Sequence, residues 1–344
     1  MIDFGPRTIQ RRGAFAAALG LALVVVGGAE SAAAEPADMA RAPIAFVGET
    51  PIDRAAIDVV LRRLYPATKP TAEQRMQLEA SVLEQLVDEA LLRGELVRQL
   101  GEVTDAELDA GVERLRSQLA SRGVALEAYL AESGRDESGL REQIRLEAAL
   151  DKYVRPRMTP DAVDAFFKQN SRDFDGTRLR VSHIVLRPDI VDNDGIDRRV
   201  RQADSIRRDI LQGRITFDEA ARRYSAGPSR HAGGDMGWIT RTAPMVEAFT
   251  KPVFALAKGD VSKPLVTPFG VHLVKVTGME PGRIGLDAVR TQLEKTMASK
   301  LVRDLVAKAR ASTPVTYAPG IAHFDPATPL DGPEPRRIQV EGGQ

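Results

Sequence analysis

The sequence predicts an α+β protein with a helical N-terminal module, a smaller domain built on an antiparallel sheet, and a C-terminal helix. Changes in the spacing of apolar residues predict this class. Up to about residue 170 the apolar residues recur every three or four positions, as on one face of a helix. From Thr177 they alternate with period two, as in a strand, and from Leu286 the helical spacing returns. The 344 residues suffice for two domains at roughly 150 residues each.

Composition excludes several classes of function. Lys+Arg and Asp+Glu both number 48, so a chain of zero formal charge has no long-range attraction to nucleic acid or to an anionic membrane. The absence of cysteine excludes disulfides, thiolate nucleophiles, iron–sulfur clusters and cysteine zinc sites. Four widely separated histidines leave little for a histidine metal site. We therefore expect no metal, no cofactor and no nucleic-acid partner.

Residues 1–34 are organised like a cleavable secretory signal peptide. Three arginines precede an uncharged apolar run from Gly13 to Ala29, and the small residues Ala32–Ala34 provide a cleavage site before Glu35. The run is shorter than the roughly 20 residues that span a bilayer, which argues against the alternative of an uncleaved anchor. We expect a protein exported to the periplasm or another extracytoplasmic space. No cysteine follows the run, so it is not expected to be a lipoprotein.

Residues 35–175 are predicted to form the helical module. A short strand over residues 44–48 leads into a helix near Asp53. Two later pairs have the spacing of a capping box, in which side chains satisfy backbone N–H groups at the start of a helix. These pairs are Thr71 with Gln74 and Thr104 with Glu107. They predict one helix up to about Leu100 and another that stops before Gly123, and further helices are expected towards Val154 and after residue 159.

Residues 176–279 are predicted to form the second domain. Its first strand, over residues 179–186, places His183 on the same face as Val181 and Val185. Helices over residues 200–211 and 217–221 follow, and then a glycine-rich segment, 227–237, in which we expect no regular structure. A helix over residues 245–256 and two short strands around Pro268 complete the domain. Because the closing strands need no crossover helix between them, an antiparallel sheet covered by helices is expected.

Residues 280–312 are predicted to form the C-terminal helix. Its apolar residues lie on one stripe, which needs an apolar partner. The members are Leu286, Val289, Leu293, Met297, Leu301 and Leu305. The tail, residues 313–344, is interrupted by prolines and contains a pair of glycines near its end, so order is expected only near residues 315–317.

The second domain resembles the parvulin-type peptidyl-prolyl cis-trans isomerases over nearly its whole length. The matching segments occur in order: Val181-Ser-His-Ile-Val-Leu186, Phe217-Asp-Glu-Ala-Ala221, Tyr224-Ser225, Gly233-Gly-Asp-Met-Gly-Trp238, Phe254-Ala-Leu256 with Lys258-Gly259, and Phe269-Gly-Val-His-Leu273. The resemblance implies a four-stranded antiparallel sheet with covering helices and isomerisation of Xaa-Pro bonds. It also implies that His183 and His272 face each other across the centre of the sheet.

Two interpretations of the histidine pair remain open. The histidines either take part in catalysis or form a core pair that orients the sheet through hydrogen bonds. The resemblance further implies a substrate-binding pocket for the proline ring, formed by Met236, Met245 and Phe249, with Thr267 and Phe269 near the histidines. For each of these residues taken singly, ordinary core packing is the alternative.

Position 227 departs from the family pattern. Parvulins usually place a cysteine or aspartate shortly after the Tyr-Ser pair, and Gly227 stands at that position here. This favours, as an alternative function, a chaperone or peptide-binding module with weak or no isomerase activity.

The helical module resembles the N-terminal chaperone regions of SurA-like and PrsA-like exported foldases. The resemblance rests on Phe46-Val-Gly-Glu-Thr-Pro-Ile52, on the leucine-rich helix after Thr71, and on its position before the parvulin segment. It implies unfolded or proline-containing client polypeptides as partners. It also implies that the helix over residues 280–312 packs back on the module, whereas the stripe alone is equally compatible with a dimer interface.

Overall fold

The computed structural model describes residues 42–64, 70–133, 136–188, 193–242, 245–325 and 338–340. The predicted signal peptide lies outside the described residues. Among the helices that are described, none is long and apolar enough to cross a membrane. The chain divides into two compact units. The first comprises residues 1–163, 294–324 and 338–344, and the second comprises residues 164–293 and 325–337. The α+β class and the four-stranded antiparallel sheet are confirmed.

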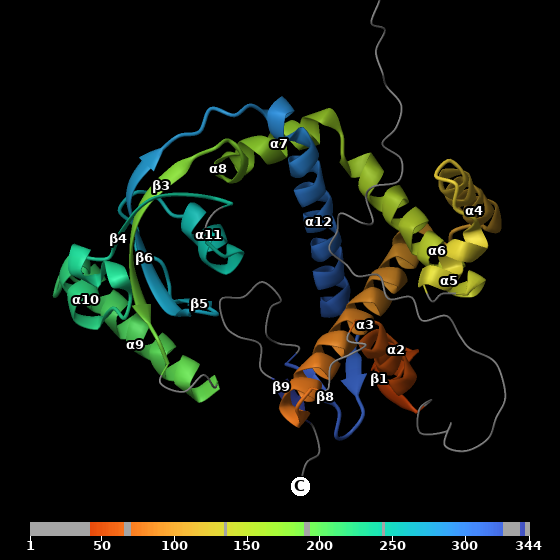
Figure 1. The fold of residues 1–344 in the computed structure, drawn as a ribbon, viewed down its shortest axis with the longest axis horizontal. Coiled ribbons are helices and arrows are strands. Elements are labelled where there is room, and N and C mark those ends of the chain that lie inside the picture. Colours follow the sequence, from red (N-terminus) through yellow and green to blue (C-terminus); the bar gives the residue numbers. More distant parts are fainter. Residues whose placement is uncertain are drawn as a thin grey trace, which may run out of the picture. The chain divides into compact units, whose positions relative to one another are not determined.

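The first unit contains a small sheet whose strands come from two distant parts of the sequence. Strand β1 (Pro43–Val47) pairs antiparallel with β2 (Thr50–Asp53) and with β7 (Val315–Tyr317), in the order β2-β1-β7 (Figure 1). Order near residues 315–317 was predicted, whereas β2 was not. Pro51 lies in β2, an edge strand, where a missing N–H is tolerated.

Two further short strands come from the tail. Strand β8 (Ala322–Phe324) pairs antiparallel with β9 (Ile338–Val340). The expectation that the tail is ordered only near residues 315–317 is therefore wrong. Three-residue strands carry no periodic signal, and their pairing depends on the tertiary structure around them.

Helices form the rest of the first unit. In chain order they are α2 (Arg54–Leu64), α3 (Ala72–Leu100), α4 (Asp105–Ala120), α5 (Leu126–Ser133), α6 (Glu137–Val154) and the start of α7 (Pro160–Gln169), with a 3-10 turn, η2 (Arg155–Arg157), before α7. Both predicted capping boxes are confirmed. The Thr71 hydroxyl accepts a hydrogen bond from the Gln74 N–H at 3.3 Å, and the Gln74 side chain accepts one from the Thr71 N–H at 3.0 Å.

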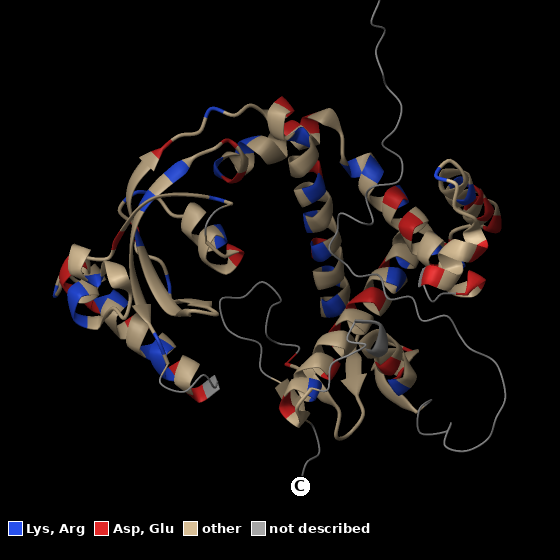
Figure 2. Cartoon of the chain, in the orientation of Figure 1, with Lys and Arg blue, Asp and Glu red and all other residues tan. Residues whose placement is uncertain are grey.

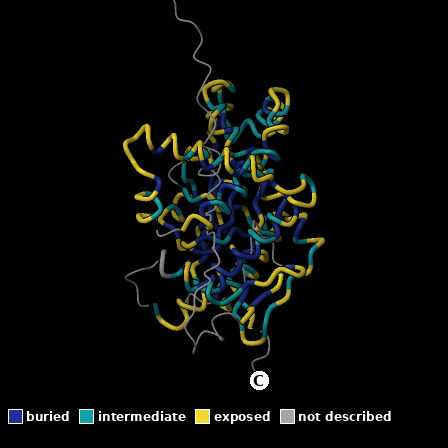
Figure 3. The backbone as a smooth tube through the Cα atoms, turned by 90° about the vertical axis from the view of Figure 1, so that its right-hand side faces the viewer, coloured by how far each residue is buried: buried dark blue, intermediate teal, exposed yellow. Residues whose placement is uncertain are grey.

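The long helix α3 takes part in two successive cores. Its first half packs with α2 and the small sheet, around Leu83 and Val87. Its second half packs through Leu92 and Leu96 against α6 and against α12 (Leu286–Ser312), which contributes Val302. Figure 3 colours the buried residues of the chain dark blue. The α12 residues between Ala298 and Val306 are therefore covered within the first unit by α3 and α6.

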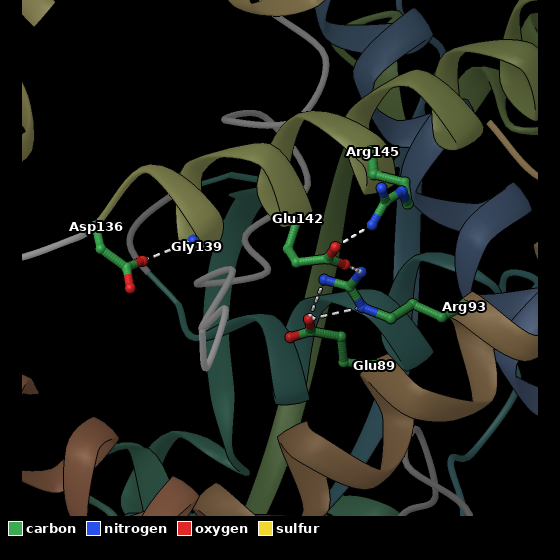
Figure 4. Close-up of polar contacts among 6 residues, drawn as sticks. All are labelled: Glu89, Arg93, Asp136, Gly139, Glu142 and Arg145. Atoms are coloured by element: carbon green, nitrogen blue, oxygen red, sulfur yellow. Dashed lines mark hydrogen bonds and ion pairs between the residues drawn. The ribbon is translucent and has the colours of Figure 1, made fainter. Parts of the chain in front are cut away.

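Polar side chains connect α3 to the helices that pack on it. The Arg93 guanidinium lies 2.7 Å from the Glu89 carboxylate on α3 and 3.3 Å from that of Glu142 on α6 (Figure 4). Glu142 also pairs with Arg145, and the Asp136 carboxylate caps α6 by accepting from the Gly139 N–H at 2.7 Å. Of these contacts, the Arg93–Glu142 pair connects α6 to α3.

The second unit is an antiparallel sheet in the order β4-β3-β6-β5. Its strands are β3 (Arg178–Leu186), β4 (Asp235–Thr240), β5 (Leu265–Thr267) and β6 (Gly270–Glu280). Helices α9 (Asn193–Leu211) and α10 (Phe217–Tyr224) cover the face that carries Ile184 and Leu273. Helix α11 (Glu247–Phe254) covers the face that carries Val181 and Val274 (Figure 1). Short helix α8 (Ser171–Phe174) precedes β3.

The glycine-rich segment contains more regular structure than expected. A 3-10 turn, η3, covers Pro228–Ala232, and β4 starts at Asp235, inside the segment predicted to be irregular. At Gly234, directly before β4, the glycine allows a close backbone approach. A Cβ on Gly234, whose φ is +84°, would lie 2.4 Å from the carbonyl oxygen of His183. Gly234 therefore lies where the backbone entering β4 packs closely against β3.

Charge is balanced on the outer helices of the second unit. Aspartates are interspersed among the arginines of α9, whose charged residues are coloured in Figure 2. Just beyond its end, the guanidinium of Arg214 lies 2.8 Å from the carboxylate of Asp209.

Candidate active site

Two histidines lie side by side on the face of the sheet that α11 covers. Strands β3 and β6 pair so that Val185 is opposite His272 and His183 is opposite Val274. The two histidines are therefore diagonal neighbours on one face, and their ring centroids are 5.7 Å apart. His183 is 8% exposed and His272 is 5% exposed. The alternation within β3 predicts the face of His183, and the family resemblance implies that His272 shares it; the strand pairing agrees with both.

Thr267 fixes one of the two rings. Its hydroxyl oxygen lies 2.9 Å from Nε2 of His272 and accepts a hydrogen bond from the Phe269 N–H at 3.1 Å. The carbonyl oxygen of Gly270 is a further acceptor, 3.3 Å from the hydroxyl. The single hydroxyl proton goes either to Gly270 or to His272, and the tautomer of His272 follows from that choice. The tight β5–β6 turn thus holds the imidazole in place.

An apolar cluster borders the pair. The Phe249 ring on α11 meets the His272 ring edge to face, with centroids 5.6 Å apart, and Phe249 is 1% exposed. Met236 and Met245 are half-buried and pack on the same cluster. The Phe269 side chain, by contrast, is 65% exposed. The structure thus brings together His183, His272, Thr267 and Phe249, places the two methionines on the same cluster, and leaves Phe269 exposed at the turn.

Gly227 lies directly against His183. A Cβ at this position would be 2.9 Å from Cγ1 of Val185 and 3.1 Å from Nε2 of His183. The backbone of Gly227 has φ −82° and ψ 157°, a conformation that any residue adopts. Packing, not backbone geometry, therefore excludes a side chain here, and Val185 fills the space that a thiol or carboxylate would need.

Ser225 holds the loop that carries Gly227. Its buried hydroxyl accepts hydrogen bonds from the Val185 N–H at 3.1 Å and from the Gly227 N–H at 3.2 Å. The Ala226 N–H also donates to the Val185 carbonyl at 2.8 Å. From sequence, Ser225 is indistinguishable from a generic loop serine. No feature of the sequence indicates that Val185 fills the space beside position 227.

The histidine pair is uncharged at neutral pH. Burial lowers the pKa of His183, and it lowers the pKa of His272 to about 4, with further contributions from the nearby His183 and Arg187. Among the described residues, neither Nδ1 atom has a hydrogen-bond partner. In the described part of the chain no cluster of metal-ligating side chains occurs. The site offers neutral imidazoles beside apolar surface.

Comparison with known proteins agrees with this geometry. Residues 183–278 match the family model of the PPIC-type PPIase (rotamase) domain. The fold and the site thus define the class: a peptidyl-prolyl cis-trans isomerase of the parvulin type. Over 254 residues the chain is 30% identical to the foldase protein PrsA of Bacillus subtilis, covering 74% of this chain and 75% of that protein. The chain belongs to the PrsA family of foldases.

Other relatives share parts of the chain. The chaperone SurA of Salmonella typhimurium is 29% identical over 221 residues, which are 60% of this chain and 51% of SurA, so the match spans about half the length of that relative. The crystal structure of PrsA from Bacillus anthracis aligns with 20% identity and a TM-score of 0.34, covering 66% of this chain and 96% of that one. The crystal structure of PrsA from Bacillus subtilis aligns with 22% identity and a TM-score of 0.26, covering 79% and 93%.

Proposed function

We propose that this protein is an exported foldase that isomerises Xaa-Pro bonds in unfolded or newly secreted client chains at the site around His183 and His272. The observation that supports it is the buried, neutral histidine pair beside the apolar cluster of Phe249. Rotation about an Xaa-Pro imide has a barrier of about 18–20 kcal/mol, because resonance stiffens the C–N bond. No covalent bond has to break. The task of the site is to bind the twisted imide better than either planar form.

An uncharged apolar site is suited to that task. A planar imide places partial negative charge on oxygen and partial positive charge on nitrogen, and the twisted state loses part of this separation. A poorly solvated environment therefore destabilises the planar forms more than the twisted one. In this proposal Met236, Met245 and Phe249 hold the proline ring. The preceding carbonyl turns beside His183, where Gly227 places no side chain.

A substitution on α11 tests the proposal with a matched control. Phe249 and Phe254 lie on the same helix, belong to the same core cluster and are almost fully buried. Of these two phenylalanines, Phe249 is the one with a described ring contact to His272. Phe249→Leu should lower kcat/KM for a chromogenic Xaa-Pro peptide about tenfold, a loss of about 1.4 kcal/mol of transition-state binding, with Phe254→Leu nearly unchanged. Equal losses in both variants, or no activity above buffer in the wild type, would refute the proposal.

The alternative, a binding module with little isomerase activity, rests on Gly227. Installing an acid there requires room, so Gly227→Asp is best compared in a chain that also carries Val185→Ala, with Val185→Ala alone as control. A large rise in rate in the double variant would show that the natural site chiefly binds proline segments. An unchanged rate would support catalysis by the uncharged site.

Chaperone binding of clients is the second part of the proposed function. Several large apolar side chains of the first unit are more than a third exposed, and they offer apolar surface to unfolded chains. They are Phe46, Val59, Met76, Val97 and Val124. Because α12 and β7 complete the cores of this unit, the test uses the full chain. A Phe249→Leu variant with reduced isomerase activity should still suppress client aggregation at stoichiometric ratio; parallel loss of both would argue against separate binding.

Export is proposed from residues 1–34 and is supported by the exported foldases that the chain resembles. Mass spectrometry of the protein recovered from the extracytoplasmic fraction should find an N-terminus at Glu35. A mature protein that retains residues 13–29 would show an uncleaved anchor instead.

A further inference from the structure

The C-terminal tail adds a strand to the edge of β8 in the first unit. Strand β9 pairs antiparallel with β8, with Ala322 opposite Val340, His323 opposite Gln339, and Phe324 opposite Ile338. Residues 326–337, which connect the two strands, lie outside the described residues. The edge of β8 thus accepts an extended segment that belongs to a distant part of the tail.

Strand β8 is held by contacts that do not involve β9. The His323 side chain is 2% exposed, and its ring stacks on that of Tyr317, with centroids 3.8 Å apart and planes at 11°. Its Nδ1 donates a hydrogen bond to the Ile321 carbonyl oxygen at 2.9 Å. Tyr317 belongs to β7, which pairs with β1. The backbone of β8 is therefore held by contacts other than its pairing with β9.

Strand β9 is bound mainly through its backbone. Gln339 and Val340 are exposed, Val340 to 45%, and only Ile338 is half-buried. Side-chain burial therefore contributes little to the choice of occupant. Main-chain hydrogen bonds along a sheet edge are available to extended segments of many sequences.

We propose that this edge of β8 is a binding site for extended segments of unfolded client chains, which add to it as a strand in place of β9. The segment it fits is extended, with an apolar residue opposite Phe324, where Ile338 is half-buried, and tolerant positions opposite His323 and Ala322. It carries no proline at its hydrogen-bonding positions, because proline has no N–H to donate. The identity of the occupant as a client rests on the proposed function. The strand-accepting edge itself does not.

Removal of β9 tests the site directly. The probe is a fluorescein-labelled peptide with the sequence of residues 336–342, followed by fluorescence anisotropy. In the full chain the tethered strand competes at an effective concentration on the order of millimolar, so the chain ending at Asp325 should bind the probe at least about tenfold more tightly. Unchanged circular dichroism and isomerase rate would show that the shortened chain is folded. Equal affinities, or no anisotropy change with the shortened chain, would overturn the proposal.

Backbone methylation distinguishes strand addition from side-chain binding. In an antiparallel pair, successive residues alternate between hydrogen-bonded and non-hydrogen-bonded positions. One probe is N-methylated at Gln339, and a second at both Ile338 and Val340. One of the two should lose binding while the other keeps it. If both bind like the unmethylated probe, the contact is not a strand ladder and the proposal fails.

A separate measurement tests whether a client chain occupies the edge of β8. Reduced and carboxymethylated α-lactalbumin, a permanently unfolded chain, should displace the probe from the chain ending at Asp325. If the probe binds but the unfolded chain does not displace it, β8 accepts its own tail only and the client assignment is overturned. The isomerase rate and aggregation suppression are measured separately, so failure here is distinguishable from failure of the proposed function.

Discussion

Because Gly227 lies against Val185, two physical arguments give opposite signs for the effect of Gly227→Ala on stability. Gly227 has φ −82°, so replacing it with alanine costs no backbone strain. By the loss of unfolded-state entropy alone, Gly227→Ala would stabilise the protein by about 0.4–1 kcal/mol. A Cβ, however, would lie 2.9 Å from Cγ1 of Val185, in a well-packed sheet. Overpacking of this kind costs about 1–3 kcal/mol. We expect the packing term to win, with a net destabilisation of about 1–2 kcal/mol.

The assay is urea unfolding followed by tryptophan fluorescence. The chain has one tryptophan, Trp238 on β4, so the signal reports the second unit. Gly94→Ala is the control for helix propensity and chain entropy, because Gly94 lies exposed on α3 with nothing within 4 Å of the position of a Cβ. Gly94→Ala should not lower the stability of the second unit. It should raise the overall free energy of unfolding by about 0.5–1 kcal/mol, and the melting temperature with it.

A double-mutant cycle isolates the contact. Val185→Ala alone removes two buried methyl groups and should cost about 2 kcal/mol. In the Val185→Ala background, Gly227→Ala should cost at least about 1 kcal/mol less than in the wild type, because the clash is gone. A Gly227→Ala protein as stable as the wild type, or costs that simply add in the double variant, would refute the packing argument.

Further predictions concern the histidines and the helical unit. Thr267→Val removes the hydroxyl that bonds His272 and should lower kcat about tenfold, whereas Thr277→Val, on the exposed end of β6, should leave it unchanged; equal effects would contradict a role for the bond. With a folded pKa of about 4 against 6.5 for the free side chain, His272 takes up its proton only in the unfolded state between these values. Its contribution to stability is therefore complete above pH 6.5 and is lost as pH falls towards 4, by about 3 kcal/mol in total. Urea midpoints of the wild type should fall more steeply over this range than those of His272→Gln, and parallel curves would contradict it. In the helical unit, Gly111→Ala should cost about 1–3 kcal/mol in thermal unfolding, because a Cβ would lie 2.4 Å from Cγ2 of Ile144; an unchanged melting curve would show that the helices can move apart.

Local patterns predicted much of the fold. The capping boxes at Thr71 and Thr104 are confirmed, because they depend only on residues three positions apart. The alternation that places His183 with Val181 and Val185 is likewise a property of one strand, whereas its pairing with His272 depends on the β3–β6 register and was expected from the family resemblance. The strands β2, β8 and β9 were not predicted, since each is three or four residues long and is stabilised only by its partner. The same limit applies to the candidate site: nothing near Gly227 in the sequence shows that Val185, more than 40 residues earlier, fills the space beside it.

The packing of Val185 beside Gly227 and the charge of the two histidines are physically connected. A carboxylate beside Nε2 of His183 would favour an imidazolium and raise its pKa, and two imidazoles only 5.7 Å apart could not both be charged in a buried site at low cost. With Val185 in that place, burial is the main cause that lowers the pKa of both histidines, and the nearby His183 and Arg187 lower that of His272 further. On the proposed function, uncharged hydrogen-bonding capacity and apolar surface remain next to the proline of the client. We propose that such a site stabilises a twisted imide through shape and weak solvation, which depend little on the residue that precedes the proline. A foldase that meets many different unfolded chains needs this tolerance, whereas a charged site would select among them.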